Sequence, residues 1–524
     1  MLHCGLLGET LGHSYSPMIH HELGDYDYRL FEVPRERLGS FLASGSWDGL
    51  NVTIPYKKAV VSYCTELSDA AAKLQSVNTI VRRSDGTLYG DNTDLYGFLY
   101  MVRRSGISPA GKKALVLGSG GASVTVKAAL EQLGAHVTVI SRSGPDNYTN
   151  LDRHADAEII ANTTPVGMYP HNGSAAVDLK QFPCCQGVLD IVYNPARTAL
   201  ILQAEQLGIP HASGLSMLVA QAKRSSEQFT GTSIDDSALE RVERIIHSRL
   251  RNIILIGMPG CGKSTVAAAL GAALNREVVE ADALIAEKAG MSIPEIFARS
   301  GEEGFRALET EVLAEQGKRS GIILSTGGGC VTRRENYPLL HQNGTIFCLT
   351  RDLSKLPTDG RPISQSTDLA QLYARRKPLY AQFADVTVSN ERNKQRVEIT
   401  IRCNGLLFRA EEAAEDPNEA VDKLVDVLLR QIRRNKTRLE KRLREGAFAP
   451  DPLFSEPVEE ESDFQVVKSK TFPVKPLDVE EAILQMNMIG HQFYMFRNMA
   501  TNEVNVVYRR NDGNYGLLEP DADE

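Results

Sequence analysis

A chain of 524 residues is long enough for roughly three or four domains, and its 42% hydrophobic and 24% charged residues are ordinary for a globular protein. The net charge of −8 argues against a chain that binds nucleic acid throughout, so we expect no DNA partner. The eight cysteines form no C-x-x-C pair, and no apolar run approaches membrane-spanning length. These features exclude a disulfide framework and a membrane partner, and they favour a cytoplasmic protein.

The first 250 residues alternate short apolar strands with helices, beginning with an expected strand at 6–8 and an expected helix at 17–23. Such alternation predicts parallel sheets and an α/β fold. A strand at 114–117 then runs into a glycine-rich turn and a helix that ends at Leu133, and another strand follows at 136–140. This order is typical of a Rossmann unit, in which a dinucleotide pyrophosphate lies on the helix N-terminus.

The type of residue after the second Rossmann strand indicates whether NAD or NADP is bound. An NAD site usually places Asp or Glu there to bind the ribose hydroxyls, whereas this chain has Arg142 between two serines. An arginine suits a 2′-phosphate, so we favour NADP. If Arg142 is only a solvated surface residue, the cofactor is NAD.

Polar side chains gather in short motifs upstream of this unit, where hydroxyl and amide groups suit a small carboxylate with several hydroxyls. The motifs contain Ser14, Ser16, residues 51–57, Asn78 and residues 90–94. Lys57 and Asp94 are candidates for the proton transfer that accompanies hydride transfer between a ketone and an alcohol. Singly, Lys57 is equally well explained as a surface lysine and Asp94 as a helix N-cap. Only the whole set indicates a site.

Over these 250 residues the sequence resembles the shikimate dehydrogenase family. The family's motifs occur in order as HSYSP, NVTIPYK, SVNTI, GDNTD, GSGGAS, NTTPVGM, DIVYNP and GLSMLVAQA. The resemblance implies that Lys57 and Asp94 are the catalytic pair. It implies substrate contacts from Ser14, Ser16, Thr53, Asn78, Asn92, Asp94 and Gln221. It assigns NADP to Gly118, Ser119, Gly120, Gly121, Ala122, Ser123, Ser141 and Arg142, with Met168 and Gly214 near the nicotinamide.

Two positions depart from that family's pattern. Ser143 stands where a second basic residue is usual, and Leu95 stands where glycine is usual. A related dehydrogenase that acts on quinate with NAD therefore stays an alternative.

A second nucleotide site follows an apolar strand at 253–256. The strand runs into GMPGCGKST and then into an alanine-rich helix at 266–274. In such a loop backbone N–H groups surround the phosphates, Lys263 reaches the β- and γ-phosphates, and the Ser264 hydroxyl ligates Mg²⁺. The nucleotide-binding residues would be Gly260, Cys261, Gly262, Lys263, Ser264 and Thr265. We expect a nucleoside triphosphate here.

Later motifs supply groups for a phosphoryl acceptor. Asp282 follows an expected strand at 277–279, and an expected strand at 322–324 runs into three glycines at 327–329. Arginines beside a glycine-rich backbone suit an acceptor carboxylate. Arg361 lies between Gly and Pro and could close over the transferring phosphate. Each arginine alone is equally well explained as part of a solvated helix face.

This region resembles shikimate kinase, on the motifs GMPGCGKST, GEEGFR, TGGG, GRP, RKPLY and the D-x-x-I of Asp282 to Ile285. The resemblance implies ATP as the nucleotide and Asp282 as the group that orients or deprotonates the attacking hydroxyl. Lys263 and Arg361 would stabilise the transition state. Shikimate would be bound by Asp282, Arg306, Gly327, Gly328, Gly329 and Arg376. Glu280 stands where the family commonly has Asp, and a kinase with another small acceptor stays an alternative.

The last part of the chain changes in composition. Strands are expected at 397–401 and 406–409, followed by a long amphipathic helix at 418–445 whose second half is rich in Arg and Lys. A basic face of this density suits RNA phosphates, although the helix dipole equally explains a solvated basic end. After an acidic linker at 447–463, the chain ends in a small module at 464–520. A module below about 60 residues gains stability by pairing with a copy of itself.

This part resembles the long form of ribosome hibernation promoting factor. The match covers RVEITIRCNGLLFRAEE, FPVKPLDVEEAILQMNMIGHQFYMFRN and NVVYRRNDGNYGLLEP. The resemblance implies 30S or 70S ribosome contact through 391–445 and a homodimer through 464–520. Kinase sequence occupies the positions of that family's first strand and helix, and residues 384–390 could close either fold. Dimerisation is thus favoured over ribosome binding.

The predicted architecture is α/β, with five segments. They are a two-lobed dehydrogenase at 1–250 (substrate lobe about 1–100 and 222–250, Rossmann lobe 101–221), a P-loop kinase at 251–390, a truncated α+β domain at 385–446, the linker at 447–463 and a β-rich dimerisation module at 464–520. The expected function is a multifunctional enzyme of the shikimate pathway. It would reduce 3-dehydroshikimate with NADPH and phosphorylate the resulting shikimate with ATP and Mg²⁺. The alternative from another class is a ribosome-associated hibernation factor with vestigial enzyme domains.

Overall fold

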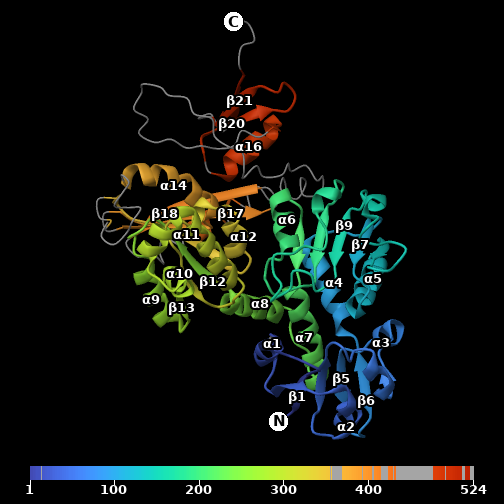
Figure 1. The fold of residues 1–524 in the computed structure, drawn as a ribbon. Coiled ribbons are helices and arrows are strands. Elements are labelled where there is room, and N and C mark those ends of the chain that lie inside the picture. The colour runs from blue at the N-terminus through green and yellow to red at the C-terminus, as the bar shows by residue number, and fades with distance from the viewer. Residues whose placement is uncertain are drawn as a thin grey trace. The chain divides into compact units, whose positions relative to one another are not determined.

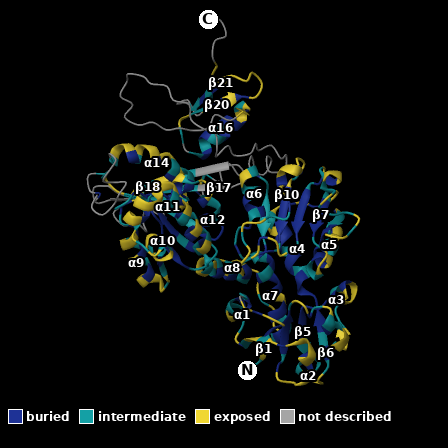
Figure 2. Ribbon diagram, in the orientation of Figure 1, coloured by how far each residue is buried: buried dark blue, intermediate teal, exposed yellow. Residues whose placement is uncertain are grey.

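The computed structural model describes residues 1–12, 14–353, 356, 369–391, 394–403, 406–414, 423–428, 430–431, 476–489, 491–509 and 514–519. Internal contacts divide the chain into two units. One comprises Met1–Ala204 with Ile209–Leu250, and the other comprises Glu205–Gly208 with Arg251–Glu524. Figure 1 gives the order of the helices and strands, and Figure 2 shows that the strands of the large sheets are mostly buried beneath helices with exposed outer faces.

The first unit begins with a six-stranded sheet in the order β2-β1-β3-β5-β6-β4. The strands are β1 (His3–Gly8), β2 (Asp27–Glu32), β3 (Gly49–Val52), β4 (Glu66–Leu67), β5 (Thr79–Arg82) and β6 (Leu88–Asp91). The helices of this lobe are α1 (Ser16–Leu23), α2 (Leu38–Ala43) and α3 (Asp69–Leu74). The predicted parallel pairing holds for β1 with β2 and β3 and for β4 with β6, but β5 runs antiparallel to β3 and β6. The turn between β5 and β6 is too short for the crossover that parallel strands need.

A five-stranded parallel sheet in the order β11-β10-β9-β7-β8 forms the second lobe. Its elements are β7 (Lys113–Leu117), β8 (His136–Ile140), β9 (Ile159–Asn162), β10 (Gly187–Asp190) and β11 (His211–Ser213), with helices α4 (Thr93–Ser105), α5 (Gly121–Gln132) and α6 (Ala199–Leu207). Every residue of β9 and β10 is buried, as expected for strands covered on both faces. The predicted Rossmann unit is confirmed as β7-α5-β8.

Two further helices, α7 (Leu215–Thr230) and α8 (Ser237–Leu250), complete this unit. Helix α7 packs closely on α4, because a Cβ added at Gly97 would lie only 2.6 Å from the Met217 carbonyl oxygen. This approach carries Gln221 from α7 to the polar end of the first sheet.

The second unit contains a seven-stranded sheet in the order β13-β14-β12-β15-β16-β17-β18. The strands are β12 (Asn252–Ile256), β13 (Val278–Glu280), β14 (Ile323–Ser325), β15 (Gly344–Thr350), β16 (Val386–Glu391), β17 (Lys394–Cys403) and β18 (Leu406–Ala414). The helices are α9 (Lys263–Leu274), α10 (Ala281–Ala289), α11 (Ile293–Gly317), α12 (Asn336–His341) and α14 (Leu369–Phe383). The first five strands are parallel, and β16, β17 and β18 pair antiparallel. The expected strands at 397–401 and 406–409 are thus longer than predicted, and they extend the P-loop sheet.

Residues 423–428 and 430–431 are helical, in line with the start of the expected helix at 418–445. Most of its basic residues, the linker at 447–463 and residues 464–475 lie outside the described residues. The final module is a four-stranded sheet of β19 (Pro476–Leu477), β20 (Phe493–Asn498), β21 (Val504–Arg509) and β22 (Tyr515–Leu518), with helix α16 (Val479–Met488). Across the described part of the chain, no helix is both long and apolar enough to cross a membrane.

Two candidate active sites

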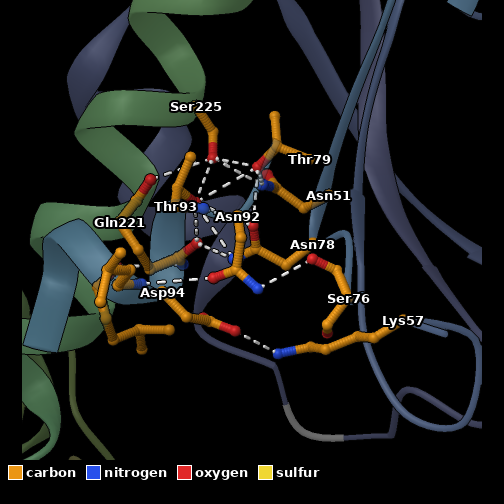
Figure 3. A network of polar contacts seen from close by, with 12 residues as sticks. Asn51, Lys57, Ser76, Asn78, Thr79, Asn92, Thr93, Asp94, Gln221 and Ser225 are labelled. Atoms are coloured by element: carbon orange, nitrogen blue, oxygen red, sulfur yellow. Dashed lines mark hydrogen bonds and ion pairs between the residues drawn. The ribbon is translucent and has the colours of Figure 1, made fainter. Parts of the chain in front are cut away.

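The first candidate site centres on an ion pair between Lys57 and Asp94. Lys57 follows β3, and Asp94 lies in the first turn of α4, where the helix dipole favours a carboxylate. Lys57 Nζ is 2.6 Å from Asp94 Oδ2, and the two side chains are 21% and 12% exposed (Figure 3). The pair is therefore shielded from bulk water yet accessible to a small molecule.

Both residues line a cavity of about 190 Å³ in the first unit. The predicted substrate residues in its wall are Ser14, Ser16, Thr53, Asn78 and Gln221. Hydroxyl, amide, ammonium and carboxylate groups thus converge on one small space, as recognition of a hydroxylated carboxylate requires. Their individual roles stay predictions.

Asn92 is placed differently from the expectation that it contacts substrate. Its Oδ1 accepts a hydrogen bond from Leu95 N at 3.3 Å, and its Nδ2 donates to the Ser76 carbonyl at 2.9 Å. Because both ends of the amide are used, Asn92 serves as the buried N-cap of α4 behind the cavity. Leu95, which stands where glycine is usual, packs against the core of the Rossmann lobe.

Sequence reasoning missed several residues of the cavity wall. They are Leu6, Asn51, Val52, Ile191, Tyr193, Met217 and Leu218. Tyr193 packs against Tyr15 with ring centroids 5.2 Å apart, and burial raises the pKa of its phenol. Asn51 and Val52 belong to the NVTIPYK motif, Ile191 and Tyr193 to DIVYNP, and Met217 and Leu218 to GLSMLVAQA, so only Leu6 stood in no motif.

The glycine-rich turn fits a dinucleotide pyrophosphate. Gly118 has φ +106, a backbone conformation that favours glycine, and Gly120 is the N-cap residue of α5. A Cβ added at Gly120 or Gly121 would meet no described atom within 4 Å, so the front of the helix is open. Backbone N–H groups and the helix dipole can bind an anion there.

Only some of the other predicted cofactor residues line the cavity beside this turn. Ala122 and Gly214 line the cavity with Lys57 and Asp94, which brings the turn and the ion pair to one space. Ser141 and the exposed Arg142 follow β8, whereas Met168 is exposed and lies outside the cavity wall. The geometry thus joins the turn to the polar cavity but leaves Met168 apart.

The second candidate site is a cavity of about 450 Å³ in the second unit. The predicted residues that line it are Gly260, Gly262, Lys263, Ser264, Thr265, Asp282, Arg306, Gly327, Gly328, Gly329 and Arg376. Pro259, Glu280, Phe297, Phe305 and Arg351 were not predicted and also line it. Cys261 is buried beneath the loop, and Arg361 lies outside the described residues.

The P-loop holds its lysine and serine for phosphate and metal. Lys263 Nζ donates to the carbonyl oxygens of Gly257 and Met258 at 3.0 and 3.1 Å. Ser264 Oγ donates to Glu280 Oε2 at 3.1 Å. A hydroxyl beside a carboxylate fits Mg²⁺, which takes oxygen ligands from protein, phosphate and water.

The three glycines lie where other groups leave no room for side chains. A Cβ at Gly327 would lie 2.5 Å from Glu309 Oε1 and 2.9 Å from Asp282 Oδ1, and one at Gly329 would overlap the Arg306 guanidinium. Arg376 Nη1 and the Tyr380 hydroxyl donate to the Gly328 carbonyl at 3.2 and 2.5 Å. The glycines therefore let Asp282 and Arg306 reach the same wall of the cavity.

Arg306 is held as a buried cation. Its Nη1 is 2.7 Å from Glu309 Oε2, and its Nη2 is 3.2 Å from Glu302 Oε1. Burial alone would lower the pKa of Arg306, but the two carboxylates outweigh this effect and raise it. A fixed cation of this kind suits a carboxylate ligand.

Comparison with known proteins gives three family matches in chain order. The shikimate dehydrogenase substrate binding domain matches residues 6–80, shikimate kinase matches 259–421, and the sigma 54 modulation/S30EA ribosomal protein C terminus matches 461–517. The kinase match includes β17 and β18, beyond the limit of 390 that the sequence suggested. The domain limits stay predictions.

Individual relatives agree with the first match. The chain is 35% identical over 260 residues to the shikimate dehydrogenase (NADP(+)) of Clostridium perfringens strain SM101, covering 45% of this chain and 96% of the relative. It is 36% identical over 281 residues to that of Methanopyrus kandleri, covering 47% and 95%. The solved shikimate 5-dehydrogenase of Thermus thermophilus is 30% identical, with 47% and 99% covered and a TM-score of 0.43. The chain belongs to the shikimate dehydrogenase family, and a shikimate kinase domain and an S30EA-type C-terminal domain follow in the same chain.

Proposed function

We infer that the chain catalyses two consecutive steps of the shikimate pathway. The first is NADPH-dependent reduction of 3-dehydroshikimate to shikimate, and the second is ATP-dependent phosphorylation of shikimate to shikimate 3-phosphate. The observation that carries this inference is the intact polar set in each cavity: Lys57 with Asp94 in one, and Lys263, Asp282 and Arg306 in the other. Such sets argue against vestigial enzyme domains.

In the dehydrogenase site, the glycine-rich turn would hold NADPH, which when bound would supply the hydride for the carbonyl carbon of the substrate. Lys57 Nζ donates a proton to the carbonyl oxygen as the alcohol forms, and Asp94 Oδ2 orients the ammonium group at 2.6 Å. Ser14, Ser16, Asn78 and Gln221 hold the hydroxyl and carboxylate oxygens. Arg142, exposed after β8, is available to a 2′-phosphate, which favours NADPH over NADH.

In the kinase site, the P-loop would hold ATP, and Ser264, beside Glu280, would hold the Mg²⁺ that neutralises phosphate charge. Asp282 accepts a hydrogen bond from the acceptor hydroxyl and receives its proton as the phosphoryl group is transferred. Arg306 and Arg376, on either side of the three glycines, bind the acceptor carboxylate. Lys263 balances the charge that develops on the phosphate oxygens.

The test is a two-step assay of the purified full chain with 3-dehydroshikimate, NADPH, ATP and Mg²⁺. NADPH absorbance reports the first step, and mass spectrometry of shikimate 3-phosphate reports the second. We expect both signals, a lower rate with NADH, and a lower rate of oxidation with quinate than with shikimate. Absence of either product would refute the corresponding activity, and preference for quinate with NAD would favour the alternative dehydrogenase.

We also propose that the C-terminal module joins two copies of the chain. Phe493, Val504 and Leu518 are 59%, 41% and 57% exposed, and the strand register places all three on one face of the sheet. The opposite face, with Phe496 and Val507, is buried against α16. A small sheet with one open apolar face suits self-association, in agreement with the S30EA-type match. Sedimentation should give a dimer, and Phe493→Glu with Leu518→Glu should give a monomer of unchanged enzyme activity.

Ribosome contact through 391–445 is a separate proposal. It rests on the basic sequence beyond Arg430, which precedes the S30EA-type match at 461–517. The test is sucrose-gradient sedimentation of the full chain with bacterial 70S ribosomes, in which co-sedimentation supports contact and absence from every ribosomal fraction refutes it.

Because every cysteine whose side chain is described is a free thiol, we propose a cytoplasmic setting, which cell fractionation would test.

A further inference from the structure

A buried polar network lies behind the dehydrogenase cavity (Figure 3). It joins β3, β5, the start of α4 and α7 through Asn51, Asn78, Thr79, Thr93, Gln221 and Ser225. All six side chains are buried, and Asn51, Asn78 and Gln221 also line the cavity. Groups of this kind are costly to bury unless their hydrogen bonds are satisfied.

Ser225 lies at the centre of this network. Its hydroxyl donates to the Gln221 carbonyl oxygen at 2.9 Å, one turn earlier on α7. Because a hydroxyl has a single proton, Ser225 Oγ must accept its two other close contacts. These come from Asn51 Nδ2 and Thr79 Oγ1, both at 2.8 Å. Thr79 is therefore the donor of its pair with Ser225.

Further hydrogen bonds fix the orientation of the three amides in the network. The Tyr28 hydroxyl donates to Asn51 Oδ1 at 2.8 Å, which turns Asn51 Nδ2 toward Ser225. Asn78 Oδ1 accepts from the backbone N–H of Thr93 at 2.7 Å. Gln221 Oε1 accepts from Thr93 Oγ1 at 3.3 Å, and Gln221 Nε2 donates to the Leu218 carbonyl at 3.1 Å. Both cavity amides thus have their oxygens turned into the network.

This orientation decides what the cavity offers to a ligand. Each amide nitrogen carries two protons. Gln221 uses one of them on Leu218, and Asn78 directs one toward Gln221 Oε1 at 3.5 Å. Asn78 also donates to Thr93 Oγ1 at 3.1 Å, so both of its N–H groups are used. One N–H of Gln221 is left for the cavity. This N–H donor matches a hydroxyl or carboxylate oxygen of the ligand.

We propose that Ser225 is a positioning residue of the dehydrogenase, which fixes the Gln221 amide as a donor toward a substrate oxygen. This inference rests on the proposed reduction of 3-dehydroshikimate. Ser225 does not line the cavity itself, so it acts through its bond to the Gln221 carbonyl and its 3.2 Å contact with Thr93 Oγ1, the donor to Gln221 Oε1.

The test compares Ser225→Ala with the matched control Ser226→Ala in the full chain. Ser226 is the next residue of α7, is equally buried, and lies outside the network. We expect Ser225→Ala to raise the KM for 3-dehydroshikimate about tenfold, with kcat changed less than about threefold and the KM for NADPH unchanged. Ser226→Ala should leave all three constants near their wild-type values.

A double-mutant cycle separates positioning from a general structural role. In a Gln221→Ala background, Ser225→Ala should raise the KM little further, because the group that it positions is gone. The same increase in both backgrounds would overturn the proposal, as would a KM for Ser225→Ala within about twofold of wild type.

A second variant covers the case in which Ser225→Ala does not fold. Thr79→Val keeps the side-chain shape and removes the donor to Ser225, so the same rise in KM is expected, and an unchanged KM would overturn the proposal. An inactive wild-type dehydrogenase would instead refute the proposed function, so the two failures are distinguishable.

Discussion

Arg306 and Glu309 form an ion pair inside the wall of the kinase cavity. Arg306 Nη1 is 2.7 Å from Glu309 Oε2, and the Glu309 side chain has no exposed surface. The same guanidinium lies where a side chain at Gly329 would be. The pair therefore connects the stability of the domain to the shape of its acceptor site.

Glu309→Ala should strongly destabilise the second unit, because it leaves the Arg306 guanidinium buried without its closest counter-charge. We expect a loss of roughly 3–5 kcal/mol in the free energy of unfolding and a raised KM for shikimate. Urea unfolding followed by kinase assay measures both. Glu302→Ala is the control, because Glu302 is 55% exposed and its loss should cost about 1 kcal/mol or less. Equal losses for the two variants would contradict the importance of the buried pair.

Lys57→Met should lower kcat of ketone reduction by about 10²- to 10⁴-fold, because it removes the proposed proton donor. The kinase rate of the same preparation is an internal control, since Lys57 lies in the other unit. Stopped assays of both products on one sample make the comparison direct. A variant that keeps most of its dehydrogenase rate would show that the proton comes from another group.

Glu280→Gln should raise the Mg²⁺ concentration needed for half-maximal kinase activity by about tenfold or more. The reason is that Glu280 Oε2 accepts the hydrogen bond of Ser264, the predicted metal ligand, and brings negative charge to the metal site. Glu277→Gln is a matched control, because Glu277 precedes the same strand and pairs with Arg319 at the surface. An unchanged Mg²⁺ dependence for Glu280→Gln would place the metal elsewhere.

Asp190 should make the stability of the first unit depend on pH. Burial raises the pKa of its carboxyl to about 6, although hydrogen bonds from Thr198, Val192 and Asn162 oppose the shift. Since the folded-state pKa exceeds the unfolded value of about 3.9, the folded state holds the extra proton between these values. The stabilising contribution of the protonated Asp190 carboxyl is complete below about pH 4 and is lost as the pH rises through 6.

Asp190→Asn should remove this dependence while keeping the three hydrogen bonds. The amide oxygen can accept from Val192 and Asn162, and the amide nitrogen can donate to Thr198. We expect the variant to have a higher Tm than wild type between pH 4.5 and pH 7. The gain in the free energy of unfolding is at most roughly 3 kcal/mol, because the pKa shift that is removed is about two units. A Tm difference that does not change with pH would contradict a titrating Asp190.

Much of the fold follows from local sequence patterns. Gly118, Gly257 and Gly262 each adopt positive φ in a strand-to-helix turn, and such turns have recognisable spacing. The antiparallel β5 was not anticipated, because an apolar strand reads the same in either direction. Residues 384–390 were expected to be able to close either fold, and β16 does pair with both β15 and β17. The sequence did not show that β17 and β18 continue the P-loop sheet, since strand pairing depends on partners far along the chain.

The candidate sites were predictable to the extent that their residues stand in motifs. Lys57 and Asp94 were found because two motifs carry them, and the structure brings them within 2.6 Å. Asn92 stands in the same motif as Asp94, yet its amide caps α4, a choice that spacing alone does not determine. Ser225 has no motif at all. Its role depends on α7 lying beside β3 and β5, which is a tertiary contact.

The pairing of strand β16 limits where the kinase domain can be truncated. It pairs with β15 on one side and with β17 on the other. A chain shortened after Asn390 would expose the backbone N–H and C=O groups of an uncharged strand, which recruits strands from other molecules. The hairpin of β17 and β18 covers that edge and places charges there instead, with Arg396 paired to Glu411 and Arg409 paired to Glu398. A kinase domain that keeps β17 and β18 should therefore aggregate less than one that ends at Asn390.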